Sequence, residues 1–145
     1  MIYLDTSYIA KCYLHEPGSP ELLRWLKGKV GLSCCLHGRL ELVSALKRHQ
    51  REGRIRASHV RQVLQRLEAD ERNHIWHWLP VTADLIREAC EQLASLPRSA
   101  VVRSADALHL TCAATHGFRQ IYTHDRRMLA VASRFGLEAV DILSA

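Results

Sequence analysis

Short apolar runs alternate with longer segments of helical periodicity along this chain, and that alternation constrains the fold more than any other feature. The apolar runs lie at 2–4, 30–33, 75–79 and 120–123, and a further small edge strand is expected at 139–142. Short buried strands joined by helices are typical of a parallel sheet whose two faces are both covered. We therefore predict an α/β fold, a three-layer α/β/α sandwich with a central parallel sheet, formed by a single domain over residues 1–145.

Capping and periodicity signals define the helices between these runs. Serine, threonine and asparagine-type caps begin helices, and a first-turn proline strengthens the signal. Helices are expected over 19–29 with Ser19 as the N-cap, over 36–50, after the N-caps Ser58 and Thr82, and over 104–115.

The composition is that of a globular protein with a basic surface. The 145 residues are 48% hydrophobic and 24% charged, with a net charge of +5 and a pI near 9.2. A basic surface attracts polyanions, of which nucleic acid is the commonest. The five cysteines are odd in number and form no C-x-x-C pair, which favours reduced thiols in the cytoplasm. The apolar runs are too short to span a membrane, and the first residues lack a signal peptide's pattern.

Two acids follow predicted strands, and two more interrupt apolar helical segments. Asp5 and Asp125 come at strand ends, and in parallel sheets such ends meet at one rim, where ligands bind. Glu41 and Asp106 have apolar neighbours on both sides. Buried carboxylates are costly unless a positive charge compensates them. A converging set of hard oxygen ligands suits Mg²⁺ or Mn²⁺.

Each acid taken singly also has a simpler structural interpretation. Asp5 and Asp125 each lie where an aspartate commonly caps a helix. Asp106 can belong to the first turn of its helix, where the helix dipole favours an acid. Glu41 can be an ordinary exposed acid. The prediction of a site therefore rests on all four acids together.

Four motifs that contain these acids resemble those of the PIN-domain nucleases. The motifs are Leu4-Asp5-Thr6-Ser7, Leu40-Glu41-Leu42-Val43-Ser44-Ala45-Leu46, Asp106-Ala107-Leu108-His109-Leu110 and Thr123-His124-Asp125. Their order and spacing are more narrowly similar to the VapC-type toxins of bacterial toxin–antitoxin pairs, and the resemblance spans essentially the whole chain. The first and third motifs are fairly specific, whereas a helical glutamate or a T-x-D triplet is weak alone.

The resemblance implies a PIN-like fold and a Mg²⁺- or Mn²⁺-dependent endoribonuclease. Asp5 and Asp106 would hold the metal most directly, and Glu41 and Asp125 would complete the catalytic cluster, partly through water. Thr6 and Thr123 would supply supporting hydroxyl groups, although polar capping is an alternative role for both. The middle residue of the last motif, His124, varies widely in the family.

The resemblance also implies partners, and the charge balance suggests a surface for RNA. A cognate antitoxin protein would occupy the acidic cleft, and a second copy of the chain would form a homodimer. Because four acids repel RNA until metal binds, cationic side chains should surround them. The candidates are Lys47, Arg48, Arg51, Arg54, Arg56, Arg98, Arg103, Arg126 and Arg127.

Other functions remain open at this point. A catalytically silent PIN-like module that binds RNA or acts as a scaffold would carry the same acids. A phosphotransferase of the haloacid-dehalogenase type needs a second aspartate where this chain has Ser7, and a response-regulator receiver needs paired acids that are missing. No H-E-x-x-H or Cys/His zinc spacing occurs. His109, three residues after Asp106, is expected to pack or form hydrogen bonds rather than to bind zinc.

Overall fold

A five-stranded parallel sheet forms the centre of the molecule. The computed structural model describes residues 1–144. Its strands are β1 (Ile2–Leu4), β2 (Leu32–Cys35), β3 (Trp76–Leu79), β4 (Gln120–Tyr122) and β5 (Glu138–Val140). All neighbouring strands pair in parallel, in the order β3-β2-β1-β4-β5. From β1 the chain adds β2 and then β3 on one side, and it then crosses to the other side of β1 to add β4 and β5. The strand order therefore reverses between β1 and β4.

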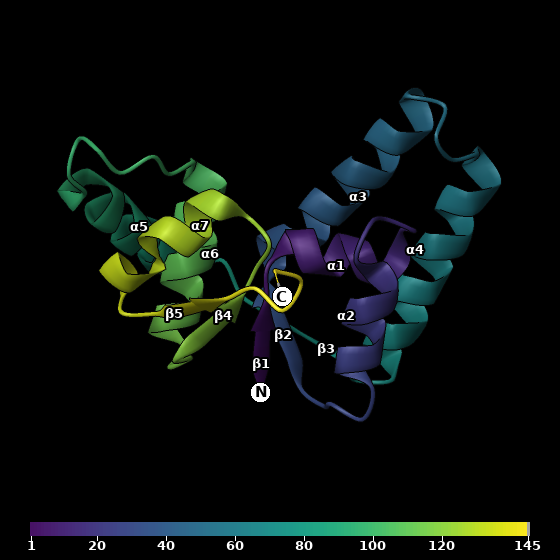
Figure 1. Ribbon diagram of the computed structural model, residues 1–145, viewed down its shortest axis with the longest axis horizontal. Helices are drawn as coiled ribbons and strands as arrows, with labels where there is room; N and C mark the ends of the chain where they lie inside the picture. Colours follow the sequence, from purple (N-terminus) through teal and green to yellow (C-terminus); the bar gives the residue numbers. More distant parts are fainter. Residues whose placement is uncertain (145) are drawn as a thin grey trace.

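Helices cover both faces of this sheet. They are α1 (Thr6–Tyr13), α2 (Ser19–Leu26), α3 (Leu36–Arg51), α4 (Ala57–Arg72), α5 (Ala83–Ser95), α6 (Ser104–Thr115), α7 (Arg126–Val131) and the 3₁₀ helix η1 (Ala132–Phe135). Helices α1 to α4 lie to one side of the strands, and α5 to α7 lie to the other (Figure 1). The predicted three-layer α/β/α sandwich with a central parallel sheet is confirmed.

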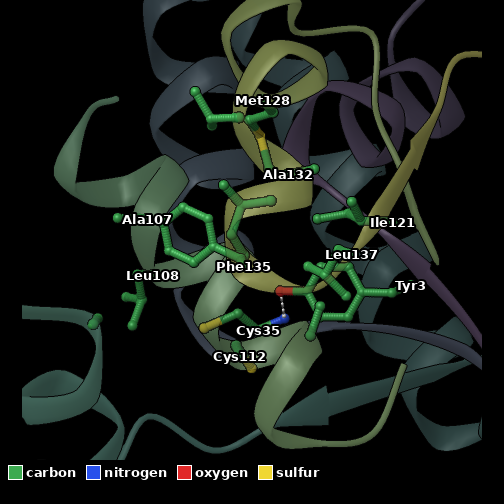
Figure 2. Close-up of a cluster of buried hydrophobic side chains, with 14 of the residues drawn as sticks. Tyr3, Cys35, Ala107, Leu108, Cys112, Ile121, Met128, Ala132, Phe135 and Leu137 are labelled. Carbon is green, nitrogen blue, oxygen red and sulfur yellow. Dashed lines mark hydrogen bonds between the residues drawn. The ribbon is translucent and has the colours of Figure 1, made fainter. Parts of the chain in front are cut away.

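Each face of the sheet has its own hydrophobic core, because successive side chains of a strand point to opposite faces. Tyr3 and Cys35 belong to the core under α5, α6 and α7, whereas Leu4 and Cys34 belong to the core under α1 to α4. All four side chains are fully buried. Figure 2 shows the first core, in which the Cys35 backbone N–H donates to the Tyr3 hydroxyl at 3.1 Å. Burial on both faces explains why the strands read as continuous apolar runs rather than alternating ones.

The second strand begins two residues later than the sequence predicted. It was expected at 30–33, but β2 spans Leu32–Cys35. Gly31 has a left-handed backbone with φ +71°, and Val30 is 84% exposed. The turn at Gly31 therefore ends the loop, and the buried pair Cys34 and Cys35, rather than Val30, supplies the apolar strand.

The predicted caps were right at one helix and wrong at two. Thr82 caps α5, since its hydroxyl accepts from the Leu85 backbone N–H at 3.1 Å. Ser19 instead lies in the first turn of α2, whose N-cap is Gly18 with φ +87°, and α2 ends at Leu26 rather than 29. Ser58 lies inside α4, which begins at Ala57. The left-handed backbone of Gly18, which disfavours any residue with a Cβ atom, rather than the serine, therefore marks the start of α2.

Two further sequence-level expectations concern the thiols and the membrane. All five cysteines are free thiols. Within residues 1–144, the helices are too short or too polar for any of them to cross a bilayer.

Candidate functional site

The site begins at the carboxyl end of β1, where Asp5 is held by hydrogen bonds on both of its carboxylate oxygens. Asp5 is 3% exposed and is the N-cap of α1. Its Oδ1 accepts from Ser7 Oγ at 2.6 Å and from the Tyr8 backbone N–H at 3.2 Å. Its Oδ2 accepts from Thr123 Oγ1 at 2.6 Å. The capping interpretation of Asp5 is therefore confirmed, and the same carboxylate also accepts a hydrogen bond from Thr123 at the end of the neighbouring strand.

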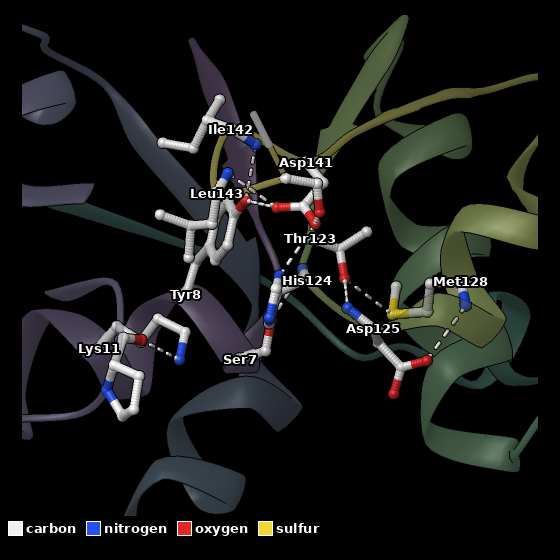
Figure 3. A network of polar contacts seen from close by, with 12 residues as sticks. Ser7, Tyr8, Lys11, Thr123, His124, Asp125, Met128, Asp141, Ile142 and Leu143 are labelled. Atoms are coloured by element: carbon white, nitrogen blue, oxygen red, sulfur yellow. Dashed lines mark hydrogen bonds and ion pairs between the residues drawn. The ribbon is translucent and has the colours of Figure 1, made fainter. Parts of the chain in front are cut away.

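Thr123 connects Asp5 to Asp125 across the point where the strand order reverses. While its hydroxyl donates to Asp5, it accepts from the Asp125 backbone N–H at 3.0 Å. Asp125 is the N-cap of α7, and its Oδ1 accepts from the backbone N–H groups of Arg127 and Met128 at 2.7 and 3.3 Å. Figure 3 shows Thr123 beside Asp125 at the end of β4. Open α/β sheets bind ligands at such a reversal of strand order, so these acids lie where the topology favours a site.

Glu41 reaches the same region from α3 and contacts two other helices. Its Oε2 accepts from Thr6 Oγ1 at 2.5 Å and lies 2.8 Å from His109 Nε2. His37, one turn earlier on α3, has its Nε2 3.9 Å from Glu41 Oε1. Glu41 is thus a partly buried carboxylate fixed by partners from α1 and α6, and not a freely solvated surface acid.

His109 is the centre of this second network. It is 3% exposed, and its Nδ1 lies 3.0 Å from the Tyr3 hydroxyl. Burial alone would lower the pKa of His109, but its contacts with Cys34 and Glu41 raise that pKa well above the usual value. Burial also raises the pKa of the Cys34 thiol, which is therefore neutral, so the Glu41 carboxylate supplies the stabilising charge. The sequence-based expectation that His109 packs or forms hydrogen bonds is confirmed.

A glycine allows these groups to approach one another. A Cβ atom on Gly38 would lie 2.6 Å from Cys34 Sγ and 3.1 Å from His109 Cε1. Real Cβ atoms do not tolerate the first of these distances. Gly38 on α3 therefore permits the close packing that brings Glu41, three residues later, within reach of His109.

Asp106 lies in the first turn of α6, close to Asp125. Its Oδ2 accepts from the Arg103 backbone N–H at 3.3 Å. Burial raises the pKa of Asp106, and the neighbouring Asp125 carboxylate raises it further. The repulsion between these two acids shows that the fold brings together residues that are far apart in sequence.

The electrostatics of the acids differ according to their partners. Burial raises the pKa of Asp5, and hydrogen bonds from Ser7 and Thr123 offset that rise only in part. Burial alone would raise the pKa of Glu41 as well, but His109 lowers it below its usual value. Asp5 and Asp106 are therefore the carboxylates that most need a compensating positive charge.

The donor chemistry of this region fits a hard divalent cation. Carboxylate and hydroxyl oxygens are ligands that Mg²⁺ and Mn²⁺ prefer. Among residues 1–144, however, no three His, Cys, Asp or Glu side chains are already arranged as a metal-binding group. Three of the acids are instead oriented by their own hydrogen bonds, to Thr123 for Asp5, to the Arg103 N–H for Asp106 and to the α7 N-terminus for Asp125.

A cleft of about 440 Å³ gives access to part of the acid set. Its walls include Glu41, Asp125 and Thr6, together with the cations Lys11 and Arg48. Asp5 lies buried behind Ser7 and Thr123 and does not line this cleft, nor does Asp106. The structure thus brings the four acids to one region, with two of them at the surface of the cleft.

The predicted basic residues divide between several surfaces. Of the nine candidates, Arg48 lines the acid cleft, and Arg54 lines a second cleft next to it. Arg126 and Arg127 line a separate hollow of about 350 Å³, and Lys47 bonds to Gln50 on its own helix.

Sequence reasoning missed two residues that hold the site. Ser7 donates to Asp5 and accepts from the His124 backbone N–H at 3.2 Å. Asp141 lies 2.9 Å from His124 Nδ1 through its Oδ2. A serine two residues after a strand-end aspartate was a local signal for Ser7, whereas nothing local indicated Asp141, which meets His124 only through the fold.

Comparison with known proteins gives consistent results. The family model described as PIN domain matches residues 2–134. The chain is 30% identical over 142 residues to "Ribonuclease VapC47" of Mycobacterium tuberculosis, covering 94% of this chain and 93% of that protein.

Three solved structures share the fold. VapC20 of Mycobacterium tuberculosis, described as a sarcin-ricin loop cleaving toxin, superposes with a TM-score of 0.69 at 22% identity, covering 90% of this chain and 95% of VapC20. VapBC2 of Rickettsia felis, bound to a promoter DNA fragment, superposes with a TM-score of 0.66 at 15% identity, covering 97% of this chain and 98% of the VapBC2 chain. FitAcB of Neisseria gonorrhoeae superposes with a TM-score of 0.66 at 17% identity, with 96% of each chain covered.

Proposed function

The chain belongs to the PIN-domain family, and from this premise we propose that it is a Mg²⁺- or Mn²⁺-dependent endoribonuclease, the toxin of a bacterial type II toxin–antitoxin pair. Residues 1–145 form its single nuclease domain. The observation that carries the proposal is the meeting of Asp5, Thr123 and Asp125 at the reversal of strand order, with Glu41 fixed nearby. The relationship to a VapC ribonuclease along nearly the whole chain supports RNA as the substrate.

The residues have distinct proposed roles. Asp5 and Asp106, whose pKa values are both raised, would hold the metal most directly. Glu41 and Asp125 would complete the catalytic cluster from the cleft wall. When bound, the divalent ion neutralises phosphate charge and lowers the pKa of water.

Two threonines support these acids. Thr123 and Thr6 each donate a hydrogen bond to a carboxylate, to Asp5 and Glu41 respectively. Each bond favours the ionised form of its carboxylate. The threonines therefore favour the ionised forms of Asp5 and Glu41, alongside Ser7 and His109 respectively, and fix the orientation of both carboxylates.

The proposed activity is tested by incubating the purified chain with a mixed RNA pool in Mg²⁺, in Mn²⁺ and in EDTA. We expect cleavage that EDTA abolishes and that Asp5→Asn removes. Asp84→Asn is a matched control, because Asp84 is an exposed acid on α5 that pairs with Arg87. Metal-dependent cleavage by folded Asp5→Asn protein at the wild-type rate would contradict the proposal.

A catalytically silent RNA-binding or scaffold module is the second candidate, and one observation favours it. The acids are held by internal hydrogen bonds and form no ready-made metal group among the described residues. RNA binding without cleavage, by a chain whose metal binding has been verified by calorimetry, would select this alternative.

Two protein partners form part of the proposal. A cognate antitoxin would block the acid cleft, as the likeness to VapBC2 and FitAcB supports. A second copy of the chain would form a homodimer and cover the apolar side chains that α3 and α5 expose. Leu40 is 65% exposed on α3, and Ile86 is 43% exposed on α5 beside an apolar groove of about 220 Å³. Leu40→Glu should shift the chain to monomer in light scattering if this surface is the interface.

A further inference from the structure

A second cleft opens directly beside the acid cleft. Its volume is about 590 Å³, within the range of ligand-binding clefts. The two clefts share Lys11, Glu16 and His124 as walls. Six side chains in the second cleft can carry positive charge, namely Lys11, His15, His49, Arg54, His59 and His124.

His124 lines both clefts, and its imidazole ring is hydrogen-bonded to Asp141. Its Nδ1 lies 2.9 Å from Asp141 Oδ2. Burial alone would raise the pKa of Asp141, but hydrogen bonds led by those from Ser144 and Tyr8 lower it to about 2. Asp141 is therefore ionised, and His124 Nδ1–H must donate to it. This leaves Nε2 as the ring nitrogen free to meet a ligand (Figure 3).

The acid within this second cleft is already neutralised by its neighbours. Glu16 Oε2 lies 3.4 Å from Lys11 Nζ, and Glu16 Oε1 lies 3.6 Å from His49 Nε2. Lys11 Nζ also donates to the Pro17 carbonyl at 3.0 Å. Lys11 and Glu16 thus form a fixed, partly buried pair, and the charge available to an incoming ligand comes from the remaining side chains.

Arg54 is the strongest of these available cations. Its side chain is 63% exposed, and its Nε lies 3.2 Å from the exposed Glu52. An exposed ion pair of this kind contributes little, so the Arg54 guanidinium can exchange Glu52 for a phosphate, to which it can bind with two parallel hydrogen bonds.

We propose that this second cleft is a subsite for the RNA backbone, in which Arg54, His59 and His124 contact phosphodiester groups that flank the scissile bond. The inference rests on the proposed ribonuclease function. A strand cut at the acid cleft has to continue along the surface, and the second cleft adjoins the acid cleft, with which it shares Lys11, Glu16 and His124. Cations at this position also offset the repulsion between the acids and the polyanion.

The test measures RNA binding as a function of salt. A dye-labelled oligouridylate of about 12 nucleotides, within the usual range of single-strand site sizes, is titrated with the full chain in EDTA, so that no metal-dependent cleavage occurs. For single strands, each phosphate contact contributes about 0.7 to the slope of log K against log salt. Arg54→Ala should therefore lower the slope by about 0.7 and weaken binding about fivefold near 0.1 M salt.

A matched control variant is available on the opposite face of the sheet. Arg87→Ala also removes one exposed arginine from a pair with a nearby acid, on α5, and should leave slope and affinity unchanged. His59→Gln should weaken binding in the same direction as Arg54→Ala. Equal slopes for Arg54→Ala and Arg87→Ala, or no saturable binding by the unmodified chain, would overturn the proposal.

The outcome is independent of the nuclease assay. A chain that binds oligouridylate through Arg54 but never cleaves RNA would refute the proposed activity and keep the subsite. If the unmodified chain cleaves RNA and Arg54→Ala binds oligouridylate normally, the subsite is refuted. The subsite is also refuted if Arg54→Ala loses antitoxin binding but not oligouridylate binding, because the cleft would then be a protein-binding site.

Discussion

Replacing Thr123 by valine should destabilise the protein strongly, although the two side chains have almost the same shape. Thr123 is fully buried, and its hydroxyl makes two short hydrogen bonds at the site, besides a long contact of 3.8 Å with Met128 Sδ. It donates to Asp5 Oδ2 at 2.6 Å and accepts from the Asp125 backbone N–H at 3.0 Å. Valine keeps the packing and removes both bonds.

The magnitude follows from the two bonds that are lost. A hydrogen bond to a charged group contributes about 1.5–3 kcal/mol, and a neutral one contributes about 0.5–1.5 kcal/mol. Burying a methyl group in place of the hydroxyl returns about 0.8 kcal/mol. The free energy of unfolding should therefore fall by about 2–3 kcal/mol, which for a domain of this size lowers the urea midpoint by about 1–2 M.

The same substitution at another buried threonine provides the control. Thr111 is 1% exposed, and within residues 1–144 its Oγ1 has no hydrogen-bond partner. An unsatisfied buried hydroxyl costs about 1–3 kcal/mol. Thr111→Val should therefore be neutral or stabilise by up to about 1 kcal/mol.

The assay is urea unfolding of the metal-free protein, followed by circular dichroism. The loss in free energy of unfolding caused by Thr123→Val should also grow with pH, because the lost hydrogen bond stabilised only the ionised form of Asp5. If Thr123→Val and Thr111→Val differ by less than about 0.5 kcal/mol, the hydroxyl does not hold Asp5 in solution and the reasoning is refuted.

Three further predictions concern the acids and His109. Asp106→Asn should stabilise the metal-free protein, because it removes a carboxylate whose charge is disfavoured first by burial and then by repulsion from Asp125. The same change should lower metal-dependent cleavage by about 10³-fold, which corresponds to the several kcal/mol that a bound metal contributes. A destabilised variant would show that the Asp106 charge is not unfavourable in the fold. Because the folded pKa values of Asp5 and Asp106 are raised above 3.8, the contribution of these two acids to stability is present below that pH and is lost as pH rises through the folded values. In differential scanning calorimetry, Mn²⁺ should therefore raise the melting temperature more at higher pH. A shift in melting temperature that does not depend on pH would argue against Asp5 and Asp106 as metal ligands. His109→Phe should cost about 3 kcal/mol in the absence of metal, because it removes the buried charged partner of Glu41 and leaves that carboxylate with Thr6 and the more distant His37. Since the His109 pKa is raised above 6.5 and the Glu41 pKa is lowered below 4.5, the cost should be largest between these values and shrink at high pH. A cost that rises with pH would contradict the pairing.

Local sequence patterns were sufficient to predict the class of fold and to find the candidate acids. Apolar runs of three to five residues between helical segments were sufficient for a parallel sheet covered on both faces, because period and burial are local properties of the chain. Asp5 and Asp125 were found for the same reason, since a strand end is visible in the sequence. The helix over 36–50 and the Thr82 cap were likewise local and were correct.

Local signals were insufficient where packing sets the boundary. Ser19 and Ser58 are good caps in sequence, yet α2 begins after Gly18 and α4 begins at Ala57. Gly18 is held against Leu143, a residue from the far end of the chain. A cap is worth about 1 kcal/mol, which tertiary contacts easily outweigh.

The partners that hold the acids could not be predicted from local patterns, because they come from distant parts of the chain. Glu41 meets His109, 68 residues later, and Asp5 meets Thr123, 118 residues later. Asp141 meets His124 because β5 lies beside β4 at the edge of the sheet. These distances depend on the crossover of each helix and on the close approach at Gly38. A sequence pattern of period 2 or 3.6 carries no information about such contacts, because it records which face a side chain occupies and not which residue lies opposite it.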